Sequence, residues 1–211
     1  MTCAGNLLLF LGCVVAISLS GVMMPGPVTA VTVTKGSQHK AAGALVAVGH
    51  GMVEFPVIAL IYLGFARFLV LPEVKISVGL AGGLVLIWMA AHMFRTRPAF
   101  FNEHKNPSQG SIVAGLAATA ANPYFFLWWA TVGAALLANA RAFSGAGVVA
   151  LGVTHWLCDL TWLYFVSWLV FKSKRLWTER VHRLVYGGCA AVLAGFGAWF
   201  IFSSINLAIA S

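Results

Sequence analysis

The chain has 211 residues, of which 61% are hydrophobic and only 9% are charged. Soluble domains carry about 25% charged residues, so this composition excludes an ordinary soluble protein and indicates one embedded in a membrane. The net charge of +8 is best explained by basic loops that face anionic lipid headgroups. Nucleic-acid binding is not expected, because no folded soluble module accompanies those loops.

A hydrocarbon core of about 30 Å requires roughly 20 apolar residues for each helical crossing. Six stretches of the chain meet this requirement, and each is apolar throughout rather than alternating, as the strands of a membrane barrel would be. The sequence therefore predicts an all-α integral membrane protein with six transmembrane helices. The predicted spans are residues 7–34, 41–69, 74–94, 111–138, 145–171 and 184–205.

The first and fourth spans contain helix-breaking residues: Pro25-Gly26-Pro27 in the first and Asn122-Pro123 in the fourth. Proline removes an amide donor and glycine weakens a helix, so both spans are predicted to break near the middle of the membrane. Broken spans are tolerated where they line a cavity, and paired breaks in corresponding halves point to a transporter's binding site. We expect these residues to bind substrate, with a carboxylate docking at the N–H groups that begin each half-helix. Two simple proline kinks without a ligand are the alternative.

The second and fifth spans each contain a histidine followed four residues later by an acid, His50 with Glu54 and His155 with Asp159. This spacing places both side chains of a pair on one helical face. Ionisable residues inside a membrane are costly and usually mark a substrate or ion pathway. Histidine titrates near neutral pH, so the four residues are predicted to couple transport to protons or cations. The structural alternative is that each pair only fastens helices together.

Three spans in each half require the second half to insert upside down relative to the first. Setting Gly43 against Gly147 aligns the two histidine-acid pairs to within one residue. The sequence thus predicts two inverted three-helix repeats, residues 1–110, which end in a basic cytoplasmic loop, and residues 111–211.

The distribution of Lys and Arg predicts the orientation, because short cytoplasmic loops carry the excess of these residues. The loops after spans one, three and five hold ten of the thirteen, and the opposite side holds Arg67, Lys75 and Arg141. Both termini are therefore predicted on the non-cytoplasmic side of the cytoplasmic, or inner, membrane. The ten are Lys35, Lys40, Arg95, Arg97, Lys105, Lys172, Lys174, Arg175, Arg180 and Arg183.

Small residues recur at four-residue spacing in the third and sixth spans. Gly79 and Gly83 form one such face, and Gly187, Ala191 and Gly195 form another. Faces of this kind allow close approach of membrane helices. They are predicted either to pack within the fold or to join two copies in a homodimer.

Taken together, Pro25-Gly26-Pro27, the basic turn from Lys35 to Lys40 and Asn122-Pro123 resemble LysE/RhtB-type translocators over essentially the whole chain. The resemblance implies a secondary active exporter of amino acids or related small metabolites, driven by a proton gradient or the membrane potential. The sequence holds no nucleophile elbow and no phosphate-binding loop, so neither an enzyme nor an ATP motor is expected. No cofactor is expected, and the partners are a small-molecule substrate and the lipid bilayer.

Two other functions stay open at the level of sequence. The same superfamily includes cation exporters, and the two imidazoles and two carboxylates of His50, Glu54, His155 and Asp159 form a plausible ligand set for a divalent cation. A non-transporting membrane scaffold would use only the small-residue faces. In that case substitutions at Glu54 and Pro25 would affect stability alone.

Overall fold

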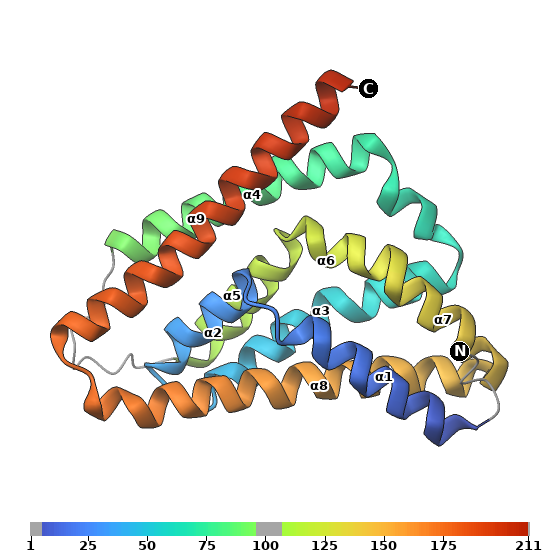
Figure 1. Ribbon diagram of the computed structural model, residues 1–211, viewed down its shortest axis with the longest axis horizontal. Coiled ribbons are helices and arrows are strands. Elements are labelled where there is room, and N and C mark those ends of the chain that lie inside the picture. Colours follow the sequence, from blue (N-terminus) through green and yellow to red (C-terminus); the bar gives the residue numbers. More distant parts are fainter. Residues whose placement is uncertain (1–5, 96–106, 211) are drawn as a thin grey trace.

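The computed structural model describes residues 6–95 and 107–210, and every regular element in these ranges is helical (Figure 1). Arg97 and Lys105, which belong to the predicted basic loop of the first repeat, lie outside the described residues. The elements are α1 (Leu7–Val22), α2 (Pro27–Gly36), α3 (Ala42–Tyr62), η1 (Phe65–Val70), α4 (Pro72–Arg95), α5 (Pro107–Ala120), α6 (Pro123–Trp128), η2 (Trp129–Gly133), α7 (Ala134–Ala140), η3 (Arg141–Phe143), α8 (Ser144–Ser173), η4 (Lys174–Leu176) and α9 (Glu179–Ala210).

The first apolar stretch is broken where the sequence predicts. The chain leaves α1 after Val22 and resumes as α2 at Pro27, with 78° between the two helices. Pro27 fits the first helical position because its missing N–H would have no partner there. Gly26 before it is extended, with φ −159°.

The second predicted break is also present. Helix α5 ends at Ala120, and Asn122 caps the start of α6 by accepting a hydrogen bond from the Tyr124 N–H. A feature that the sequence did not predict follows: η2 is a π-helical segment in which Trp129 is buried. Such segments insert an extra residue into a helical turn and so rotate the side chains that follow.

The predicted second span, residues 41–69, extends too far at its C-terminal end. Helix α3 ends at Tyr62, Gly64 adopts a left-handed conformation with φ 94°, and a 3₁₀ segment, η1, follows. Glycine tolerates this conformation at little cost and ends the helix there. Apolar composition alone does not reveal this turn.

By length and composition, four helical stretches in the described residues are able to cross a membrane: α3, α4, α9 and residues 123–176. The bent pair α1 and α2 makes a fifth if it is counted as one span. Within residues 123–176 the chain reverses direction between α7 and α8 (Figure 1), next to Ser144 with its φ of 61°. Helix α5, with 14 residues, is shorter than a full crossing.

The helices pack so that segments from the two halves of the chain alternate. Helix α3 lies between α5 and α8, α1 and α2 pack against α8, and α4 pairs with α9. The largest buried cluster of the described residues joins α1, α3, α6, η2 and α7 to α8, with Phe10, Trp129 and Leu151 almost fully enclosed. This core lies beside the predicted functional residues.

The two small-residue faces behave differently. A Cβ atom at Gly79 would overlap Ser204 of α9, and one at Gly83 would lie 2.7 Å from the Gly197 carbonyl oxygen. The first face therefore packs within the fold. At Gly187 and Gly195 a Cβ atom would meet none of the described residues within 4 Å, so in this part of the chain the second face is uncovered.

Candidate functional site

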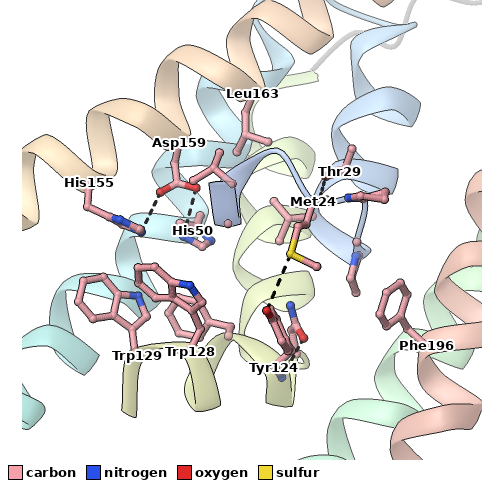
Figure 2. A pocket seen from close by; sticks show the side chains of 18 of the residues that line it. Met24, Thr29, His50, Tyr124, Trp128, Trp129, His155, Asp159, Leu163 and Phe196 are labelled. Atoms are coloured by element: carbon pink, nitrogen blue, oxygen red, sulfur yellow. Dashed lines mark hydrogen bonds and ion pairs between the residues drawn. The ribbon is translucent and has the colours of Figure 1, made fainter. Parts of the chain in front are cut away.

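The two helix breaks border one cavity of about 260 Å³ (Figure 2). Pro25, Gly26, Pro27 and Asn122 line it, as the sequence predicts for a substrate site. Pro123 lines a second cavity instead, of about 220 Å³, which shares Tyr124 and Trp199 with the first. Thus four of the five predicted substrate-binding residues meet in one cavity.

The N-terminus of α2 opens into this first cavity. No side chain caps it, and Val28 and Thr29, whose N–H groups have no partner within a helix, are lining residues. The Thr29 hydroxyl reaches back across the break to the Met24 carbonyl, 3.4 Å away. The equivalent end of α6 differs, because Asn122 already accepts the Tyr124 N–H. Only the first break therefore presents uncapped N–H groups to the cavity.

The two histidine-acid pairs come together into one buried cluster of four side chains. His155 Nε2 lies 3.1 Å from Glu54 Oε1 and 3.5 Å from Asp159 Oδ2. His50 Nε2 lies 3.7 Å from Glu54 Oε1 and 3.9 Å from Asp159 Oδ1. Each histidine thus contacts both its own acid and the acid of the other pair. The shortest contact, from His155 to Glu54, joins the two halves of the chain.

Two hydroxyl groups contact the far sides of the imidazole rings, and neither is among the site residues predicted from the sequence. Ser18 Oγ lies 2.7 Å from His155 Nδ1, and Thr119 Oγ1 lies 2.9 Å from His50 Nδ1. Each hydroxyl comes from the broken span of one half and binds the histidine of the other half. A hydroxyl residue shortly before each break was the available signal, but serine and threonine are common in membrane helices.

The Thr119 contact bears on which ring nitrogen of His50 carries the proton. It therefore bears on whether Nε2, the nitrogen that faces the acids, has a free lone pair. When Thr119 Oγ1 donates its only proton to the Gly115 carbonyl, 2.8 Å away, His50 Nδ1–H donates to Thr119. A neutral His50 then turns an unprotonated Nε2 toward Glu54 and Asp159. That arrangement is stable only with a proton or another cation between the ring and the carboxylates.

Glu54 is the least accessible member of the cluster. Its side chain is fully buried, and neither carboxylate oxygen accepts a hydrogen bond from the described residues. All ion-pair contacts of Glu54 and Asp159 within the described ranges come from the two histidines. Buried carboxylates require a positive partner or their own proton, so the number of protons in the cluster sets its charge.

Glu54 also differs from the other three residues in its position relative to the cavity. His50, His155 and Asp159 line the cavity, whereas Glu54 lies behind them. Figure 2 shows Asp159 between the two histidine rings on one side of the cavity, with Met24 and Thr29 across from it. A ligand in the cavity would contact Asp159 directly and Glu54 only through a histidine.

Aromatic rings enclose the cluster. Trp128 and Trp129 lie with their ring centroids 4.9 and 5.0 Å from that of His155, and Phe125 meets His50 edge-on at 5.3 Å. These residues come from α6 and the π-helical segment that follow the second break. The break therefore also positions the aromatic rings that pack against the two histidines.

A divalent cation as transported substrate is chemically compatible with part of the cluster. One ligand atom each from His50, Glu54 and Asp159 lie within 4.8 Å of one another, and all three residues are buried. Imidazole and carboxylate ligands suit several transition metals. His155 does not belong to this group of three, although its Nε2 lies 3.1 Å from Glu54 Oε1 and 3.5 Å from Asp159 Oδ2.

Comparison with protein families agrees with the fold and the composition. The family model for the LysE type translocator matches residues 19–204. Comparisons with curated proteins and with solved structures give no match. The matched range contains both helix breaks and all four cluster residues. The chain belongs to the LysE type translocator family, and it is a multi-pass membrane protein that transports small molecules and is not an enzyme.

Proposed function

We propose that the protein is a secondary active exporter of amino acids or related small metabolites across the cytoplasmic membrane, driven by a proton gradient or the membrane potential. One observation carries the proposal: the cavity between the two helix breaks is also lined by three members of the histidine-acid cluster. A substrate site and a proton-binding group therefore share one space. Binding of one can then alter binding of the other.

The proposed architecture is six crossings in two inverted repeats, residues 1–110 and 111–211. Three features support it: the reversal between α7 and α8, the reciprocal packing of α1 on α8 and α5 on α3, and the crosswise contacts of the histidines. In this arrangement the cavity lies where the repeats meet. Rocking of one repeat against the other would open it to alternate sides of the membrane.

The membrane potential supplies enough energy for such an exchange. Moving one elementary charge across 100 mV is worth about 2.3 kcal/mol. Since about 1.4 kcal/mol corresponds to a factor of ten, one proton per substrate supports a concentration ratio of roughly fiftyfold. His50, Glu54, His155 and Asp159 are the proposed proton carriers in this exchange.

The second candidate function is export of a divalent cation. It is favoured by the three ligand atoms of His50, Glu54 and Asp159 within 4.8 Å. In this case the cluster would bind the transported cation itself, and the uncapped N-terminus of α2 would have no role in substrate binding.

Export is tested by loading cells with mixed dipeptides and measuring amino acids and metals in cells and medium by mass spectrometry. Cells expressing the wild type are expected to release at least one amino acid faster than cells with Asp159→Asn, because Asp159 lines the cavity. Glu73→Gln is the matched control, since Glu73 lies exposed in the first turn of α4. Release that is equal in all three strains contradicts export, and a fall in cellular metal supports the cation function instead.

The orientation gives a separate prediction. Alkaline phosphatase, which is active only outside the cytoplasm, is expected to be active when fused after Ala210 and inactive when fused after Lys174. Lys174 begins the short basic segment η4 between α8 and α9, and basic loops stay in the cytoplasm. Fusions of a fluorescent protein that folds only in the cytoplasm provide the reciprocal control. The opposite pattern in both reporters would reverse the proposed orientation.

A further inference from the structure

We propose that the substrates are amino acids with large apolar side chains, aromatic ones above all, bound with the ammonium group at Asp159. The inference rests on the proposed export function and narrows its substrate class. It depends on the chemistry of the cavity wall: which charges reach the cavity and which side chains form the remaining surface.

A single acidic side chain reaches the cavity. Among the residues that the structure describes, Asp159 is the only Asp or Glu that lines it, and no described Lys or Arg does. Asp159 is 6% exposed, and its Oδ2 atom, which lies 3.5 Å from His155 Nε2, accepts no hydrogen bond from the described residues. The carboxylate therefore has acceptor capacity that no described hydrogen-bond donor uses, and an ammonium group in the cavity that Asp159 lines would supply a donor.

The negative end of the substrate has a separate partner. The uncapped start of α2, with the N–H groups of Val28 and Thr29, borders the same cavity and carries the positive end of the helix dipole. A carboxylate there and an ammonium at Asp159 describe a zwitterion. The cluster on one side and the helix break on the other are seen facing each other in Figure 2.

The same charges disfavour a basic amino acid. A lysine or arginine substrate carries a second cation, which would need a second carboxylate within the cavity. The second acid of the cluster, Glu54, is fully buried behind the histidines and does not line the cavity. A second positive charge would therefore lose its hydration without gaining a partner.

The rest of the wall suits an apolar side chain. Met24, Tyr124, Trp128, Phe196 and Trp199 line the cavity. Tyr124 and Met24 touch through the hydroxyl and the sulfur, 3.8 Å apart, and the flexible thioether can adapt to rings of different shape. The volume of about 260 Å³ is below the roughly 300–1,000 Å³ of pockets for drug-sized ligands, which favours a single amino acid over a peptide.

The inference is tested with purified protein in liposomes by counterflow. Liposomes loaded with unlabelled phenylalanine take up labelled phenylalanine, and unlabelled competitors are then added outside. Phenylalanine, tryptophan and leucine are expected to compete at least about tenfold better than alanine, glycine or lysine, since even one methylene in an apolar pocket is worth about 10-fold or more.

Trp199→Ala is expected to weaken competition by phenylalanine about tenfold and to leave competition by alanine unchanged. Tyr124→Leu provides a second variant in case Trp199→Ala does not fold. The matched control is Trp88→Ala, since Trp88 is exposed on α4 and lines neither of the two cavities described.

The outcomes separate the two levels of the proposal. If lysine or alanine drives counterflow and the aromatic amino acids do not, the narrower substrate class is wrong while amino-acid transport stands. If no amino acid exchanges in liposomes loaded with each one in turn, the proposed function itself fails. Equal effects of Trp199→Ala on phenylalanine and alanine would also overturn the inference, because they would indicate a structural role.

Discussion

Glu54→Gln is expected to reduce export driven by a pH gradient strongly while exchange of labelled for unlabelled substrate continues. Glu54 is fully buried and contacts His155 Nε2 at 3.1 Å, but it does not line the cavity. Glutamine has nearly the same shape and can keep the close contact with His155, so the fold should persist. It cannot bind or release a proton. Coupling free energies of about 1–3 kcal/mol correspond to a loss of roughly 5- to 150-fold in the pH-driven rate.

The measurement compares two assays on the same proteoliposomes, counterflow at equal pH and efflux after a pH jump. Asp159→Asn is the variant to compare with Glu54→Gln. Asp159 lines the cavity, so its replacement should impair both counterflow and pH-driven efflux. Glu73→Gln should impair neither. A Glu54→Gln variant that responds to the pH jump like the wild type would show that Glu54 carries no transported proton. Loss of metal export in both variants would favour the divalent-cation function.

Gly43→Ala is expected to destabilise the protein more than alanine at any other glycine of α3. A Cβ atom at Gly43 would overlap the backbone carbonyl of Leu163 in α8 and lie 2.7 Å from Ser167 Oγ. Backbone cannot move aside as a side-chain tip can, so α3 and α8, which carry the two histidine-acid pairs, must separate. Overpacking typically costs about 1–3 kcal/mol, and we expect the upper end, a fall in melting temperature of roughly 6–12 °C.

The melting temperature is measured in detergent by following the monodisperse fraction after heating. Gly187→Ala and Gly195→Ala are the matched controls, because an added Cβ atom meets nothing within 4 Å at either position. Alanine favours a helix by up to about 1 kcal/mol over glycine, so these variants should be unchanged or slightly more stable. A Gly43→Ala protein that melts with the wild type would contradict the close contact of α3 and α8.

Separation of α3 from α8 also has a functional consequence. The contact between His155 and Glu54 spans these two helices, and so does the contact between His50 and Asp159. A Gly43→Ala protein that is still inserted is therefore expected to lose pH-driven export as Glu54→Gln does.

Features that depend on neighbouring residues along the chain can be predicted without the structure. The interruptions at Pro25-Gly26-Pro27 and Asn122-Pro123 follow from missing amide donors, and both are present in the structure. The i, i+4 spacing placed His50 beside Glu54 and His155 beside Asp159 on their own helices, at 3.7 and 3.5 Å. The helical, membrane-embedded character followed from composition, since lipid leaves backbone polar groups no other partners.

Tertiary structure alone decided how these parts meet. Helix packing brought the two pairs into one cluster, placed Ser18 and Thr119 on the outer nitrogens of the histidines, and left Asp159 but not Glu54 at the cavity. The same holds for the end of α3 at Tyr62 and the π-helical segment at Trp129, which apolar sequences do not distinguish from continuous helix. The physical reason is that contacts between α3, α5 and α8 join residues far apart in the chain, and in an almost uniformly apolar sequence the local pattern does not specify which faces meet.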